Sequence, residues 1–265
     1  MVTTTTSMAT TTPDVGYSVL LPTYEERENL PLIVWLLVRA LAALPGSPTY
    51  EILIIDDNSP DGTFEIAKDL ATRVFAVESN KQGFPIIRPL WRPGKLGLGS
   101  AYVFGLREAK GEFVIILDAD MSHHPDDIAA MVQRQAADNC DIVTGSRYCY
   151  STGPRGGVCG WDLKRKLTSR VANYIATVLL RPGDLTDLTG SFRLYRRSAL
   201  ESIIHKVQSK GYTFQMEIMI RAIDAGMSFG EVPITFVDRL YGESKLGGAE
   251  VINYLKGLFF LFWTT

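Results

Sequence analysis

The chain has 265 residues, of which 46% are hydrophobic and 21% are charged. This length and composition are typical of one globular domain with a sizeable core, and they exclude a chain dominated by disorder. The formal net charge is only -2, so we expect no nucleic-acid partner. The three cysteines form no C-x-x-C pair, which favours a reduced compartment.

The two ends of the chain differ from its body. Residues 1–15 are rich in threonine and lack both basic residues and an apolar core, so we predict a disordered tail and no targeting signal. Residues 16–248 form the predicted single domain. Residues 249–265 are predicted to form an amphipathic helix, too short to span a bilayer, that either docks on a partner or membrane interface or packs on the protein's own core.

Strand and helix patterns alternate through the first half of the domain. Short apolar runs predict buried strands over 17–21, 50–56, 84–90, 112–118 and 141–146. Helical periodicity and start signals predict helices over 30–44, from residue 63, over 99–110 and over 125–137. This alternation predicts an α/β fold with a mostly parallel sheet flanked by helices on both faces.

The pattern changes after residue 146. Residues 147–160 are rich in glycine and proline and predict a mobile loop beside the site. A helix with a basic start follows over 162–180, and later come a helix over 213–225 and a strand over 230–237.

The strongest local signal is the segment VIILDADMS, in which a buried strand ends in Asp118 and Asp120. Alternate side chains of an extended chain share one face, and the carboxyl ends of parallel strands line the ligand crevice of α/β sheets. Such a carboxylate pair suits Mg²⁺ or Mn²⁺, with water and phosphate oxygens completing the shell. Two solvated turn aspartates explain the motif equally well in isolation, and the adjacent His123 and His124 are not predicted as ligands because their side chains point apart.

Two other predicted strands also end in polar residues. Asp56 and Asp57 close the strand over 50–56, and Pro22 to Glu26 follow the first strand, so three strand ends are predicted to meet at one crevice. Turn chemistry alone accounts for the Asn58 to Gly62 part.

Basic residues cluster in two places. Arg239 and Lys245, on a glycine-containing segment, would neutralise a departing diphosphate, or they belong to an ordinary exposed loop. The second cluster consists of Arg147, Arg155, Lys164, Arg165, Lys166 and Arg170. It suits an anionic acceptor or membrane headgroups, or it forms a solvated helix face.

Six motifs occur in a fixed order: LLPTYEERENLP, IIDDNSPDGT, ILDADMSHHP, TGSRY, DLTGSFRLYRR and DRLYGESKLGG. Through them, residues 17–250 resemble the dolichol-phosphate mannosyltransferases of glycosyltransferase family two, which have the GT-A fold, in their short eukaryotic form without transmembrane helices. The resemblance implies transfer of mannose from GDP-mannose to dolichyl phosphate for glycosylation and GPI anchor synthesis. It also implies small membrane-anchoring subunits and a place on the cytosolic face of the endoplasmic reticulum.

The resemblance also assigns residues. It implies that Asp118, Ala119 and Asp120 hold the metal, Mg²⁺ or Mn²⁺, and the diphosphate, with Arg239 and Lys245 completing the donor site. Arg147, Arg165 and Ser169 would face the acceptor phosphate. The guanosine part would contact Pro22, Tyr24, Glu26, Ile55 and Asp57. The sequence departs from the family at Glu25, where asparagine is common, and at Ser122, where some relatives supply a glutamine near the metal.

The predicted mechanism is one inverting displacement in which the lipid phosphate attacks the sugar directly. A phosphate monoester is already ionised near neutral pH, so no strong general base is required. Asp118, Asp120 and Arg147 are the predicted catalytic residues. Two alternatives stay open: a dolichyl-phosphate glucosyltransferase using UDP-glucose, and a catalytically silent nucleotide-sugar-binding subunit. A dinucleotide oxidoreductase is disfavoured because no G-x-G-x-x-G follows the first strand.

Overall fold

The computed structural model describes residues 15–76, 86–149, 157–160, 163–180, 183–209, 211, 213–241, 256–258 and 263. Most of the predicted tail (1–15) and of the predicted C-terminal helix (249–265) lies outside this set. No helix among the described residues is both long and apolar enough to cross a membrane.

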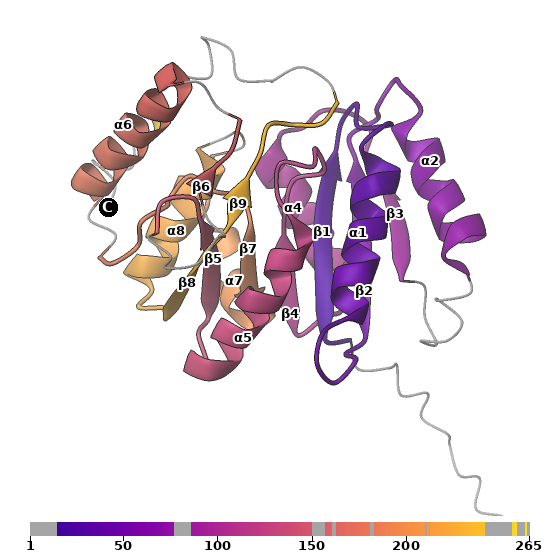
Figure 1. The fold of residues 1–265 in the computed structure, drawn as a ribbon, viewed down its shortest axis with the longest axis horizontal. Helices are drawn as coiled ribbons and strands as arrows, with labels where there is room; N and C mark the ends of the chain where they lie inside the picture. The colour runs from indigo at the N-terminus through magenta and orange to yellow at the C-terminus, as the bar shows by residue number, and fades with distance from the viewer. Residues whose placement is uncertain are drawn as a thin grey trace, which may run out of the picture.

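A seven-stranded sheet forms the centre of the molecule, in the order β3-β2-β1-β4-β7-β5-β8 (Figure 1). All neighbouring strands pair in parallel except β7, which is antiparallel to both β4 and β5. The mostly parallel α/β fold predicted from the sequence is therefore confirmed. The strands are β1 (Tyr17–Thr23), β2 (Tyr50–Asp56), β3 (Ile87–Trp91), β4 (Phe113–Ile116), β5 (Ile142–Ser146), β7 (Arg193–Arg196) and β8 (Phe229–Pro233).

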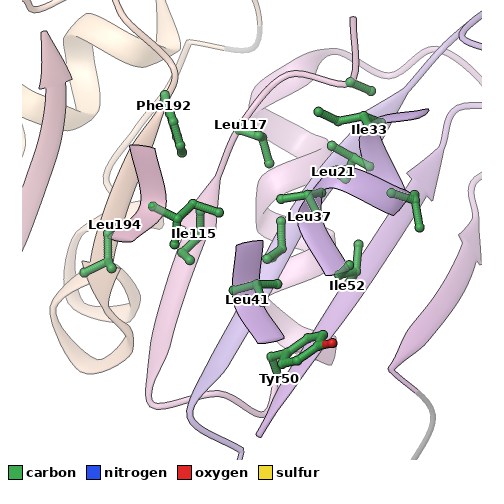
Figure 2. Packing of buried hydrophobic residues seen from close by; sticks show 14 of the residues in the cluster. Leu21, Ile33, Leu37, Leu41, Tyr50, Ile52, Ile115, Leu117, Phe192 and Leu194 are labelled. Carbon is green, nitrogen blue, oxygen red and sulfur yellow. The ribbon is translucent and has the colours of Figure 1, made fainter. Parts of the chain in front are cut away.

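Helices cover both faces of this sheet. Successive strand residues point to opposite faces, so Leu21 packs toward α1 and α2 while Leu20 packs toward α4. Figure 2 shows Ile33, Leu37 and Leu41 of α1 lying against the sheet. The helices are α1 (Leu30–Ala42), α2 (Thr63–Asp69), α4 (Leu98–Glu108), α5 (Ile128–Asp138), α6 (Leu163–Leu180), α7 (Arg197–Ile204) and α8 (Phe214–Asp224).

Two irregular turns extend these helices. A 3₁₀ turn, η2 (Pro125–Asp127), leads into α5, and a π turn, η1 (Leu70–Val74), continues α2.

The strand predicted over 230–237 is in fact two strands in different sheets. After β8 ends at Pro233, Ile234 still donates to Ser146 O, but β9 (Thr235–Phe236) then pairs with β6 (Gly157–Val158) in a separate two-stranded sheet. A proline lacks the N–H needed to continue a ladder, which fits the break at this point. The end of the predicted 147–160 loop is thus a strand.

Candidate functional site

The site is built on the carboxyl ends of three adjacent parallel strands, β2, β1 and β4. The strand ends are bonded together: Thr23 Oγ1 donates to Asp56 Oδ1 at 3.0 Å, and the Asp57 N–H donates to Thr23 O at 3.1 Å. This arrangement places Pro22, Ile55 and Asp57 at the same sheet edge as Asp118, two residues beyond β4. The predicted convergence of three strand ends is therefore present.

The Asp118 and Asp120 carboxylates interact electrostatically at this edge. Burial raises the pKa of Asp118, and the negative charges of Asp120 and Glu26 raise it further. Ser191 Oγ donates to Asp118 Oδ2 at 2.8 Å. Burial alone would also raise the pKa of Asp120, but hydrogen bonds from Ser122 and Arg239 hold it below its usual value.

These two carboxylates fit a divalent metal ion. Burial is the largest cause of the raised pKa of Asp118, and the nearby charges of Asp120 and Glu26 add to it; a bound cation would offset both effects. Among the described residues, no cluster of three or more His, Cys, Asp or Glu offers an all-protein cage. A sparse pair of carboxylates is the donor set that Mg²⁺ or Mn²⁺ uses when substrate phosphates complete its shell.

The turn after the carboxylates is strained. Met121 has a φ of +66°, in the left-handed region that bulky side chains rarely adopt. The turn lets the Ser122 N–H donate to Asp120 Oδ1 at 3.1 Å, while Ser122 O accepts from the Val237 N–H at 3.1 Å. The strain is therefore coupled to fixing the Asp120 carboxylate.

His123 is buried next to the Asp118 carboxylate. Its ring lies between Phe192 and Phe236, at centroid distances of 5.3 and 5.1 Å. Burial lowers the pKa of His123 to about 4, so the imidazole is neutral near pH 7. Its Nδ1 lies 3.9 Å from Asp118 Oδ2, which is beyond hydrogen-bonding distance.

Aromatic and charged groups surround the residues that were predicted to bind the donor. Lys95 lies 4.3 Å from the centre of the Tyr24 ring, in a cation–π contact, and Arg92 donates to Asp57 Oδ1 at 2.6 Å. Burial raises the pKa of Asp57, and Arg92 opposes that rise. Glu26 accepts a 2.7 Å hydrogen bond from Asn29.

The segment of residues 237–241, which follows β9, lies against Asp120. Arg239 Nη2 donates to Asp120 Oδ2 at 2.8 Å and to Glu26 Oε1 at 3.5 Å. The Leu240 N–H donates to Asp120 O at 3.3 Å, and Tyr241 O accepts from Asn29. The structure thus brings Arg239 to the predicted site, while Lys245 lies outside the described residues.

Arg147 directly follows β5, is held by Asp187 and interacts electrostatically with Asp118. Its Nε and Nη2 donate to the two Asp187 oxygens at 2.7 and 2.9 Å, and Nη2 also donates to Thr189 Oγ1 at 2.6 Å. Burial alone would raise the pKa of Asp187, but Arg147 lowers it to about 2. A fork-to-fork pair of this kind fixes the plane of the guanidinium group.

Two other predicted acceptor residues lie on α6. The Tyr148 hydroxyl and Ser169 Oγ are 2.6 Å apart, so Ser169 is adjacent to the Arg147 loop. Arg165 belongs to the first turn of α6, but its side chain lies outside the described residues.

Three residues at the site were not predicted from the sequence: Asp187, Ser191 and Arg92. Asp187 and Ser191 belong to the quoted motif DLTGSFRLYRR, but no role was assigned to either. Arg92 directly follows β3 at the same sheet edge, and that position is the signal that would have identified it.

The mostly parallel sheet flanked by helices is a GT-A-like fold, with the carboxylate pair at the edge where that fold was predicted to bind its ligands. Residues 18–204 match the family model of glycosyl transferase family 2, and the chain belongs to that family.

Two bacterial relatives are similar over most of their length. The polyprenol monophosphomannose synthase of Mycolicibacterium smegmatis is 39% identical, over 92% of this chain and 85% of the relative. The undecaprenyl-phosphate mannosyltransferase of Micrococcus luteus is 36% identical, over 88% of each chain. Among solved structures, glucosyl-3-phosphoglycerate synthase from Mycobacterium tuberculosis has a TM-score of 0.64 at 17% identity, covering 95% of this chain and 81% of that one, which supports the fold.

Proposed function

We propose that this protein transfers mannose from GDP-mannose to the phosphate of a polyprenol, specifically dolichyl phosphate. The observation that carries the proposal is the arrangement of charge: Arg239 is bonded to Asp120, one carboxylate of the pair, and Arg147 interacts electrostatically with the other, Asp118. A nucleotide-sugar donor and an anionic acceptor each need such a cation. The two bacterial relatives, a polyprenol monophosphomannose synthase and an undecaprenyl-phosphate mannosyltransferase, support mannose as the transferred sugar and a polyprenyl phosphate as the acceptor.

Each side of the site has a distinct role in this proposal. Asp118, Ala119 and Asp120 would hold the metal and the diphosphate, and the metal would stabilise the negative charge that develops on the leaving nucleotide. Arg239 exchanges its contact with Asp120 for the diphosphate, together with Lys245. The guanosine lies on the surface formed by Pro22, Tyr24, Glu26, Ile55 and Asp57.

The acceptor side needs orientation more than base catalysis. The lipid phosphate is already ionised near neutral pH, so it attacks the anomeric carbon directly and inverts its configuration. Arg147, whose plane is fixed by Asp187, aligns that phosphate, and Arg165 and Ser169 complete its surroundings.

The same proposal places the protein in the cell. A polyprenyl phosphate is embedded in a membrane, so the enzyme works at a membrane surface. We place it on the cytosolic face of the endoplasmic reticulum, held by small membrane-anchoring subunits, where its product would serve glycosylation and GPI anchor synthesis.

Parallel transfer assays test the function directly. We expect radiolabel from GDP-mannose to reach a short polyprenyl phosphate in the presence of Mg²⁺ or Mn²⁺, and chelation to abolish the transfer. Labelling from UDP-glucose alone would show that UDP-glucose, and not GDP-mannose, is the donor. Metal-dependent GDP binding without turnover, even with membrane subunits present, would indicate a catalytically silent subunit. Asp120→Ala should abolish transfer, whereas Asp126→Ala, which removes an exposed partner of Arg39, should not.

A further inference from the structure

Helix α6 carries its apolar side chains on the outside of the molecule. Figure 1 shows this helix at one end of the fold, beyond β6 and α8. Five of its large apolar side chains are 38% to 69% exposed: Leu167, Val171, Tyr174, Ile175 and Val178. Their spacing of i, i+4, i+7, i+8 and i+11 places them on one face, which we call the outer face of α6.

The opposite face of α6 is turned inward, and its polar side chains make hydrogen bonds with the rest of the protein. Asn173 donates to Thr186 O at 2.6 Å and accepts from the Leu188 N–H at 3.3 Å, and Ser169 contacts Tyr148. Asn173 is 7% exposed, and Ala176 on the same side is fully buried. This is the reverse of an ordinary surface helix, whose polar face meets water.

Charge indicates what covers the outer face. The sequence of α6 contains four basic residues and no acidic residue, and all four basic residues lie in its N-terminal half: Lys164, Arg165, Lys166 and Arg170. Arg170 is exposed beside the apolar side chains. An apolar face beside an exposed cation, on a helix that has basic but no acidic residues, matches an anionic lipid surface, where the apolar groups enter the interface and the cations meet headgroups.

The position of α6 also fits a membrane. Ser169, on the inward face, contacts Tyr148, which directly follows Arg147, so the outer face and the acceptor side belong to one region. We propose that the outer face of α6 docks on an anionic bilayer surface and presents the Arg147 side of the site to a phosphate at that surface. The second part of this statement rests on the proposed function, whereas the first part does not.

Vesicle flotation of the full chain tests the docking surface. We use vesicles of phosphatidylcholine with phosphatidylserine and no polyprenyl phosphate, so the result does not depend on transfer activity. The wild-type protein should float with these vesicles, and a smaller fraction should float at high salt. The triple variant Leu167→Gln/Val171→Gln/Val178→Gln should bind the vesicles at least about tenfold more weakly. Glutamine keeps a helix propensity close to that of leucine, and circular dichroism verifies folding.

The matched control removes three exposed apolar side chains elsewhere: Leu32→Gln/Trp35→Gln/Val74→Gln. This control should float like the wild type. Equal flotation of both triple variants would overturn the proposal, as would a wild-type protein that does not bind vesicles. So would a wild-type dimer that only the α6 variant dissociates, because a second copy would then cover the outer face.

Activity separates this inference from the proposed function. With a short, water-soluble prenyl phosphate as acceptor, the α6 variant should transfer sugar like the wild type, and only transfer to a vesicle-embedded acceptor should fall. If no donor supports transfer with either acceptor, the proposed function is wrong, and flotation still decides the docking surface.

Discussion

At the scale of single residues, Asp187 determines how Arg147 is presented. Asp187 is fully buried and holds the guanidinium group by two hydrogen bonds. If Arg147 aligns the acceptor phosphate as proposed, Asp187→Asn should lower kcat/KM for the lipid acceptor at least tenfold by freeing the guanidinium group, while the KM for the donor stays unchanged. Asp184→Asn, an exposed change in the same loop, is the matched control and should leave both constants unaltered.

The same carboxylate links stability to pH. Its folded-state pKa of about 2 lies below the usual value of 3.8, so the folded protein favours the ionised form. The resulting stabilisation, about 2 kcal/mol, is complete above the unfolded-state pKa and is lost as the pH falls toward 2. Denaturant unfolding should therefore show a large stability difference between wild type and Asp187→Asn at pH 7 and a much smaller one near pH 2. An equal difference at both pH values would contradict the assignment.

Glu25 occupies a backbone conformation that suits another residue. Its φ of +55° lies in the left-handed region, which asparagine adopts more readily than glutamate. We expect Glu25→Asn to raise the free energy of unfolding by up to about 1 kcal/mol. Glu28 is nearby and has no positive φ, so Glu28→Asn should change the free energy of unfolding, measured in urea, by no more than about 0.5 kcal/mol. The strain is the physical consequence of having glutamate at a position where the resembled family commonly has asparagine.

At the scale of elements, α4 approaches the sheet closely only because position 105 is glycine. A Cβ added to Gly105 would overlap Ile55 Cδ1 and lie 3.1 Å from Leu20 Cδ2. Overpacking of this kind costs about 1–3 kcal/mol, and the better helix propensity of alanine offsets part of that cost. Gly105→Ala should therefore lower the thermal midpoint, whereas Gly94→Ala, which meets no atom within 4 Å, should not. An unchanged midpoint in both variants would show that α4 can shift outward without cost.

At the scale of the whole molecule, the carboxyl and amino ends of the parallel strands carry different features. The site lies at the carboxyl ends of β1, β2 and β4, whereas a buried polar network lies toward the amino end of β1. There Glu51 is fully buried and accepts from Arg88 at 2.7 Å, from Ser18 at 2.7 Å and from the Lys110 N–H at 2.6 Å. This network joins β1, β2, β3 and the end of α4.

Glu51→Gln should therefore reduce stability and leave the chemistry intact. Breaking the pair with Arg88 leaves a largely buried cation with a poorer partner, and we expect a loss of roughly 2–3 kcal/mol. Activity per folded molecule, measured well below the unfolding temperature, should equal that of the wild type. The control Glu108→Gln removes the exposed partner of Arg88 and should cost about 0.5 kcal/mol or less. A fall in kcat for Glu51→Gln would show that the two ends of the strands are coupled.

The sequence by itself determined the elements and the edge that carries the site. Apolar runs, helix start signals and breakers located β1 to β5 and most of the helices, because local periodicity depends on neighbours in the chain, but they did not locate β6, β7 or α7. Asp118 and Asp120 followed from the same logic, since a carboxylate pair at a strand end needs no tertiary information to be noticed.

Only the tertiary structure decided how distant segments meet. The antiparallel direction of β7, the break between β8 and β9, and the pairing of Arg147 with Asp187, forty residues later, all depend on long-range contacts. The same holds for α6: its composition indicates a basic helix, but which of its faces meets the protein depends on Asn173 and Ser169 finding partners in other loops. A sequence specifies which side chains share a face, and packing against the rest of the chain determines which face is left outside.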